Sequence, residues 1–299
     1  MNSYDDILTN AAPAKQAFDE NDFNVDAWKE KKQAERQAVY ELADSTAANL
    51  AGNGEKFQAY LDVQARFDRY SATNVMLIFA QMPDAAPPLR DFDGWKERGI
   101  SIRKNQKAIS ILEPGEEYTR EDGSMGVSYN VKKVFALSQT DSKETQRPAA
   151  VDERQLLKAL IHNPPAAIRS SDELPKGMGA LYQPERNEIL VRRGMAFEDI
   201  FHSVAQELAH AQFAEKDKAY SRGAYGFKAY CASYLLSQKH GVSVVGYDFS
   251  KLPESLHGME PQEIRAALME IRDAAAVVNG RMARAQEAAK VPKSREAER

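Results

Sequence analysis

A glutamate and a histidine in one predicted helix form the strongest chemical signal in the sequence. The segment Gln206-Glu207-Leu208-Ala209-His210 differs only at its first position from H-E-x-x-H, in which two histidines one helical turn apart bind zinc. In that pattern the glutamate acts as general base on the metal-bound water. Because Gln206 is a weak, neutral ligand, the segment predicts a zincin-like helix that has lost one metal ligand.

Other candidate ligands are not well spaced in the sequence to share a metal ion with His210. His202 is eight residues from His210, roughly 12 Å along a helix axis, so it could join a zinc site only if the helix were distorted. Residues 218–247 contain no Asp or Glu, and their only histidine is His240. Three interpretations remain open: a metal-free zincin-like helix, an ordinary helix surface, or a zinc site with His210 and altered ligands, namely His202, His240 or His257.

The helix that carries these residues is predicted over residues 197–216. One stripe along it is apolar, and the opposite face carries His202, Gln206 and His210, with Glu207 at its flank. In the metal-free interpretation, we expect Glu207 and His210 to form a hydrogen-bonded pair beneath the tyrosines of residues 225–234. The apolar stripe consists of Phe197, Ile200, Phe201, Val204, Leu208 and Ala211.

Hydrophobic periodicity and turn residues predict an α+β fold. The first half should form a helical N-terminal segment with a small β-sheet. The second half should form a mainly helical domain with a β-hairpin, which contains the zincin-like helix. The domains are predicted at residues 1–22 (flexible leader), 23–147, 148–289 and 290–299 (charged tail). Helices are predicted at 24–52, 55–66, 71–82 (with Ser71 as N-cap), 152–162, 197–216, 224–240 and from 261 past 282. Strands are predicted at 100–102, 108–112, 127–131, 134–137, 180–182 and 189–191, with a linker at 138–148.

The first half combines cations with aromatic residues, as single-stranded DNA binding requires. Residues 90–111 contain six basic and three acidic side chains. Other roles remain open: Tyr70 and Trp95 as core aromatics, and Asn74 as a hydrogen-bonding clamp on the neighbouring β-segment. The predicted DNA-binding residues are Arg69, Tyr70, Asn74, Trp95, Arg103, Lys104 and Lys107.

Composition excludes several other classes of protein. The formal net charge of -4 excludes a uniformly basic nucleic-acid coat. The longest apolar run, residues 75–80, is far too short to span a membrane. The single cysteine, Cys231, cannot form an internal disulfide and is expected to be a buried thiol. With no secretory signal visible, we expect a cytoplasmic protein without a membrane partner.

The order of these motifs resembles the ArdC-type antirestriction proteins of mobile elements and the related LtrC-like proteins of conjugative elements. The resemblance covers residues 25–285. It implies an N-terminal domain that binds single-stranded DNA, joined to a zincin-like metallopeptidase domain. Gln206 and the missing acidic ligand depart from the pattern. The matching segments are residues 70–78, Trp95, 102–114, 134–140, 207–211 and 229–235.

Together, residues and resemblance predict a single-stranded DNA-binding accessory protein of a mobile genetic element, acting in antirestriction or conjugation. Its expected partners are single-stranded DNA and restriction or conjugation proteins. The zincin-like domain is expected to be inactive and to hold no cofactor. One alternative is a zinc metallopeptidase with Glu207 as base and His210 as ligand. The other is a non-catalytic protein–protein interaction module.

Overall fold

The structure is a computed structural model that describes residues 24–120, 122–142 and 152–290. The predicted leader and the predicted domain boundary between residues 147 and 148 lie outside this part. The predicted tail lies outside it too, except for Lys290, which ends the last helix. Among the described residues, no helix is both long enough and apolar enough to cross a membrane.

The three predicted helices of the first half are confirmed. Each begins at a side-chain cap: Asn24 and Asn53 accept backbone N–H groups, and the hydroxyl of Ser71 accepts from the backbone N–H of Asn74 at 3.3 Å. These helices are α2 (Val25–Ala51), α3 (Gly54–Arg66) and α4 (Ala72–Gln81).

The β-sheet of the first half differs from its prediction. The segments predicted as separate strands at 127–131 and 134–137 form one strand, because the polar pair between them stays on the surface, where Lys132 reaches Glu113 and Lys133 reaches Glu35. Residues 100–102 form only an isolated bridge, from Ile102 to Thr140. The antiparallel sheet has the order β1-β3-β2. Its elements are β1 (Leu89–Arg90), β2 (Ile109–Thr119) and β3 (Met125–Ala136), with the unpredicted short helix α5 (Phe92–Lys96) after β1.

Two amide side chains of α4 hold the free edge of β2. The Asn74 amide donates to the carbonyl of Leu112 and accepts from its N–H, both at 2.8 Å. Two residues earlier in β2, the Gln81 amide donates to the carbonyl of Ser110 and accepts from its N–H, both at 2.9 Å. Alternate residues of a strand direct their backbone groups to the same edge, so two amides on one helix face can reach both. The predicted clamp role of Asn74 is therefore confirmed.

The second half contains the predicted helices and hairpin, and one strand that was not predicted. Strands β5 and β6 form the antiparallel hairpin, and β4 pairs parallel with β6. The segment of β4 has only one large apolar residue, Ile168, which explains why its sequence did not indicate a strand. The elements are α6 (Glu153–Leu160), β4 (Ala167–Ser171), β5 (Ala180–Gln183), β6 (Glu188–Arg192), α7 (Phe197–Lys216), α8 (Arg222–Lys239) and α9 (Pro261–Lys290), with 3-10 turns η1 (Leu137–Gln139) and η2 (Glu254–Leu256).

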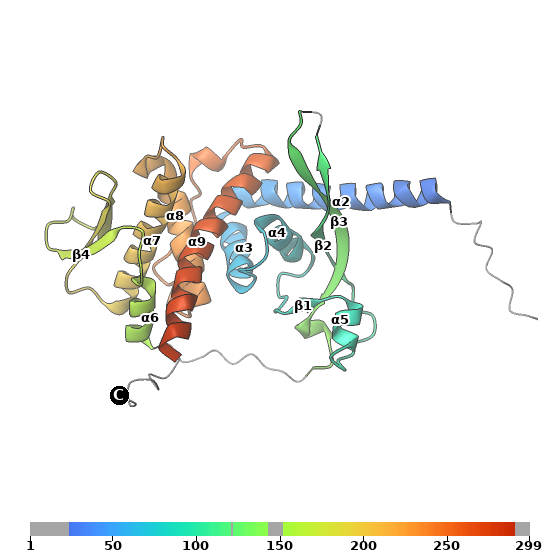
Figure 1. The fold of residues 1–299 in the computed structure, drawn as a ribbon, viewed down its shortest axis with the longest axis horizontal. Coiled ribbons are helices and arrows are strands. Elements are labelled where there is room, and N and C mark those ends of the chain that lie inside the picture. Colours follow the sequence, from blue (N-terminus) through green and yellow to red (C-terminus); the bar gives the residue numbers. More distant parts are fainter. Residues whose placement is uncertain (1–23, 121, 143–151, 291–299) are drawn as a thin grey trace, which may run out of the picture.

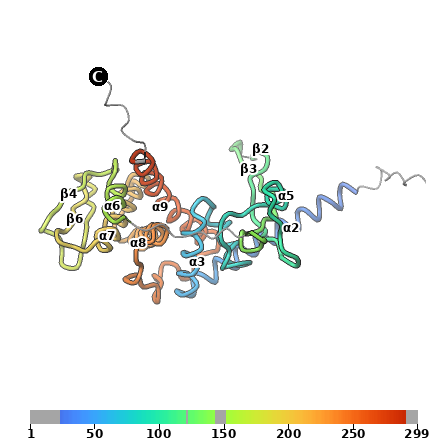
Figure 2. The backbone as a smooth tube through the Cα atoms, turned by 90° about the horizontal axis from the view of Figure 1, so that it is seen from below, coloured from blue at the N-terminus to red at the C-terminus, as the bar shows by residue number. Residues whose placement is uncertain are grey.

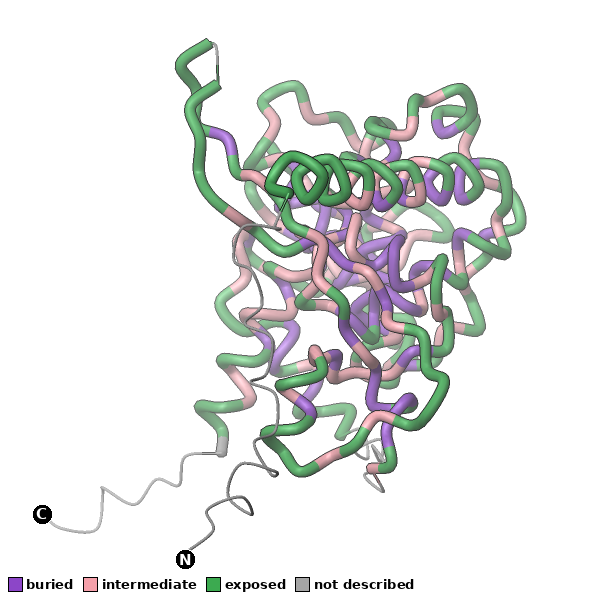
Figure 3. Tube along the Cα trace, turned by 90° about the vertical axis from the view of Figure 1, so that its right-hand side faces the viewer, coloured by how far each residue is buried: buried purple, intermediate pink, exposed green. Residues whose placement is uncertain are grey.

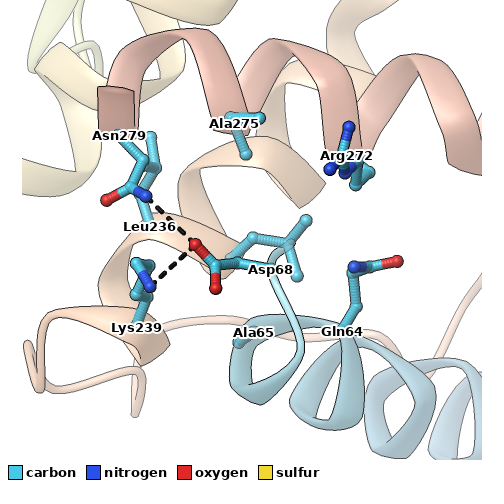
Figure 4. A pocket seen from close by; sticks show the side chains of 10 residues that line it. Gln64, Ala65, Asp68, Leu236, Lys239, Arg272, Ala275 and Asn279 are labelled. Atoms are coloured by element: carbon cyan, nitrogen blue, oxygen red, sulfur yellow. Dashed lines mark hydrogen bonds and ion pairs between the residues drawn. The ribbon is translucent and has the colours of Figure 1, made fainter. Parts of the chain in front are cut away.

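Helices from both halves share one hydrophobic core. The two sheets lie at opposite ends of the molecule, and α3, α8 and α9 lie between them (Figures 1 and 2). Polar contacts also join the halves: Lys239 and Asn279 contact the carboxylate of Asp68 at 2.8 and 3.2 Å (Figure 4), and Tyr234 donates to Asp62 at 2.6 Å. The described residues before and after the predicted boundary therefore fold against each other.

We predict that Asn74→Ala lowers the free energy of unfolding by about 1–3 kcal/mol, because it leaves the N–H and carbonyl of Leu112 without partners. Urea unfolding followed by circular dichroism measures the change. Asn49→Ala is the matched control, since its exposed amide bonds only within its own helix. A loss for Asn74→Ala no larger than for Asn49→Ala would contradict the clamp.

Candidate functional site

The helix α7 is buried on both of its faces at the zincin-like segment. Phe201, Val204 and Leu208 enter the core as predicted. On the other side, only 2% of Glu207 and 1% of His210 are exposed, because β5 and the chain that leads into α8 pack over them. The interpretation as an ordinary exposed helix surface is therefore wrong.

The carboxylate of Glu207 is held by three hydrogen bonds. Arg222, the first residue of α8, donates one guanidinium nitrogen to each oxygen at 2.6 Å. The backbone N–H of Tyr182 in β5 donates to Oε2 at 2.7 Å. The hydrogen bonds that Arg222 donates to Glu207 raise the pKa of Arg222 above its ordinary value. A carboxylate with both oxygens occupied in this way is not placed to take a proton from water.

His210 lies next to this ion pair and is bonded to a tyrosine. Its Nδ1 atom is 2.9 Å from the hydroxyl of Tyr220. Burial lowers the pKa of His210 to about 4; the attraction of Glu207 opposes this shift and the charge of Arg222 adds to it. Burial also raises the pKa of Tyr220 to about 12. Both groups are therefore neutral at pH 7.

The partners of Glu207 and His210 differ from those expected. No hydrogen bond joins the two residues to each other; each bonds instead to the segment just before or at the start of α8, through Tyr220 and Arg222. Three of the four cations of residues 218–239 pair with acids on other elements. Besides Arg222, Lys228 pairs with Glu270, and Lys239 with Asp68.

The side chains around His210 do not fit a metal ion. Among the described residues, no group of three or more His, Cys, Asp or Glu side chains could hold one. Nε2 of His202 bonds to the carbonyl of Ser243 at 2.8 Å, and Nε2 of His240 bonds to Asn279 at 3.0 Å. The predicted metal ligands His210 and His202 thus have separate hydrogen-bond partners, and the carboxylate of Glu207 is paired with Arg222.

Of the predicted DNA-binding residues, Trp95 belongs to the core. Only 1% of its surface is exposed, its Nε1 donates to the carbonyl of Phe135 at 3.0 Å, and the Arg90 guanidinium lies 5.8 Å from its ring centre. The ring is not available to stack on a base. This corrects the prediction that Trp95 binds DNA and supports its alternative role as a core aromatic.

Tyr70 and Asn74 line one surface groove of about 350 Å³ between α4, α5 and the sheet. Two cations line this groove, Arg90 and Lys132. Lys132 is neutralised, because it lies 3.3 Å from Asp91 and 2.8 Å from Glu113. The Asn74 amide is already hydrogen-bonded to the backbone of β2. The groove therefore offers a phosphate one cation, Arg90, that forms no ion pair with a described residue.

The remaining predicted residues are exposed cations. Arg69 lies between α3 and α4. The others belong to residues 96–107, a segment that we call the cationic loop. The buried side chain of Gln139 holds the end of this loop, because the Gln139 amide donates to the carbonyl of Lys107 at 2.7 Å. Gln139 lies in the predicted linker, so its role was missed. The loop contains five exposed cations, none of which forms an ion pair with a described residue: Lys96, Arg98, Arg103, Lys104 and Lys107.

The chain has structural neighbours but no match among sequences. No protein-family model matches it, and no curated protein does. It is similar to two crystal structures of the antirestriction protein ArdC from the R388 plasmid, one metal-free and one bound to Mn(II). The metal-free structure is 20% identical over 72% of this chain and 86% of that one, with a TM-score of 0.47. The Mn(II)-bound structure is 18% identical over 72% and 85%, with a TM-score of 0.46. At this similarity, the roles of individual residues rest on their own contacts.

We predict that acid destabilises the fold partly through His210. The unfolded chain takes up a proton on this histidine near pH 6.5 and the folded chain only near pH 4, so stability falls as the pH falls between these values. From pH 7.5 to 5 this should cost about 2 kcal/mol. Urea unfolding of wild type and His210→Gln at both pH values isolates the effect from His202 and His240, whose pKa values burial also lowers. An equal loss in both proteins would contradict the neutral state of His210.

Proposed function

We propose that the protein binds single-stranded DNA through its first half, as an accessory protein of a mobile genetic element that acts in antirestriction or conjugation. The observation that carries this proposal is the cationic loop. Its five cations are exposed, while the single acid within the segment is Glu97. By contrast, Lys132 of the same half is neutralised by Asp91 and Glu113.

A cluster of unpaired cations fits a phosphate backbone better than it fits a neutral ligand. Repulsion between neighbouring cations is relieved when phosphates approach, and the release of condensed counterions drives binding. The protein as a whole is acidic, with a net charge of -4, so attraction to DNA depends on local groups of cations such as this loop. A local group of cations orients a strand on the protein.

We propose further that the zincin-like part is not a peptidase. In a metallopeptidase the glutamate of the motif must reach a metal-bound water. Here Glu207 neutralises Arg222, and the guanidinium of Arg222 supplies the positive charge next to His210. Glu207 also accepts a hydrogen bond from the N–H of Tyr182, which belongs to an edge strand of the sheet. The arrangement supports a closed structural seam between α7, β5 and α8.

We predict that a fluorescein-labelled single-stranded oligonucleotide binds the protein, with fluorescence anisotropy as the readout. The triple variant Arg103→Gln, Lys104→Gln, Lys107→Gln should bind more weakly. It should also lower the slope of log Kd against log salt by about 2, as expected for three lost phosphate contacts to a single strand. Absence of binding by wild type at low salt would contradict the proposed function. Partner proteins that co-purify with such a chain would then favour the interaction-module alternative.

We predict that purified protein contains no stoichiometric zinc or manganese, and that its melting temperature is unchanged by chelator or by either added metal. Elemental analysis and thermal melts measure this, with His210→Ala as the comparison variant. Stoichiometric metal in wild type that is lost in His210→Ala would instead support the metallopeptidase alternative. The DNA-binding proposal would not be affected by that result.

A further inference from the structure

A second surface of the first half combines cations with aromatic rings. A groove of about 590 Å³ runs along α2 and is closed on one side by β3. Its lining includes three cations and two aromatic residues but no carboxylate. We call it the α2 groove. It is lined by Trp28, Lys29, Lys32, Gln33, Arg36, Gln37, Tyr40 and Asn130.

Exposed apolar residues lie at the start of α2 and on the neighbouring hairpin. Of the ten large hydrophobic residues that are exposed in the described part of the chain, six lie in the first turns of α2 or on the β2–β3 hairpin. The hairpin crosses α2 and projects beyond it (Figure 1), and the surface there is mostly exposed (Figure 3). Burial raises the pKa of Tyr40, and Tyr129 and Tyr118 add to this shift, which places both tyrosines near Tyr40. The six residues are Val25, Trp28, Tyr118, Met125, Val127 and Tyr129.

The cations of the α2 groove are available to a polyanion. Arg36 forms no ion pair with a described residue. Lys29 and Lys32 pair only within α2, at 3.8 Å to Asp26 and 3.4 Å to Glu35. Such exposed pairs contribute between zero and about 1 kcal/mol, so a phosphate can replace them at little cost. The spacing of these cations along the helix places them on one face, beside the ring of Trp28.

We propose that the α2 groove binds the bases of single-stranded nucleic acid, with Trp28 as the stacking platform and Lys29, Lys32 and Arg36 as the phosphate contacts. This inference rests on the proposed function and adds to the cationic loop a second, base-contacting surface. Unpaired bases expose the ring faces that stack on aromatic side chains, whereas a duplex hides them. An acidic peptide could satisfy the cations but supplies no planar base to stack on the indole.

The two tryptophans of the chain make stacking directly visible. Trp28 is 48% exposed and Trp95 is 1% exposed, so a base that stacks on the protein should quench the fluorescence of Trp28 alone. Titration of wild type with unlabelled oligothymidine should quench the emission at the same concentrations that raise the anisotropy of labelled DNA. An abasic oligonucleotide of equal length should bind through its phosphates with little quenching, and duplex DNA should quench weakly.

Variants at Trp28 separate stacking from charge. Trp28→Ala should remove the quenching and raise Kd about 5- to 100-fold, the range for loss of one base–aromatic stack. Trp28→Phe should also remove the tryptophan signal while it recovers much of the affinity. Because Trp28 lies near the exposed start of α2, both variants should melt within a few degrees of wild type.

Variants at the cations test the path of the phosphates. Lys29→Gln, Lys32→Gln, Arg36→Gln should weaken binding and lower the salt slope by about 2. A control with the same change of net charge carries substitutions at three exposed lysines of the second half that form no ion pair with a described residue. These are Lys176→Gln, Lys218→Gln and Lys251→Gln.

The possible results distinguish this inference from the proposed function. Binding by wild type that weakens in the cationic-loop variant, but shows no quenching and is unchanged by Trp28→Ala, would overturn the α2 groove and leave the proposed function intact. Equal weakening by the α2 variant and the control lysines would also overturn it. No binding of single strands by wild type would overturn both. If an acidic peptide quenches Trp28 and binds with a lower Kd than DNA, the groove would instead be assigned to a protein partner.

Discussion

The buried carboxylate of Glu207 sets the arrangement of the second half. A charge with 2% exposure must be neutralised and fully hydrogen-bonded inside the protein. Arg222 supplies the opposite charge and Tyr182 the third hydrogen bond, so one carboxylate ties α7 to the start of α8 and to an edge strand of the hairpin. Removal of Arg222 alone would leave an unpaired charge in the core. This makes the pair a requirement of the fold rather than a surface contact.

Polar side chains hold the first half together in a similar way. Asn74 and Gln81 complete the edge of β2, and Gln139 fixes the base of the cationic loop. These amides satisfy backbone groups that no strand pairs with. With the scaffold fixed by neutral groups, the cations of the loop and of the α2 groove remain available on the surface. Rigidity and charge are thus provided by different residues.

The fate of the predicted site residues shows where sequence reasoning fails. Trp95 was expected at the DNA surface and lies in the core, because α5, a helix of only five residues, places its indole under Phe135. Trp28, which was not among the predicted site residues, is instead the exposed indole. Both are tryptophans within mixed charged segments, so composition alone could not rank them. Their burial depends on which elements pack over them.

The sequence by itself determined the helices other than α5, the Ser71 cap and the α+β class, because hydrophobic periodicity and capping act over a few neighbouring residues. It also determined that α7 carries an incomplete metal-binding motif. Only the tertiary structure decided that Arg222 neutralises Glu207, that Tyr220 bonds to His210 and that β4 joins β6. Those partners lie 10 to 21 residues apart along the chain. Such pairings follow from how the elements pack against one another, which a local pattern of side chains does not specify.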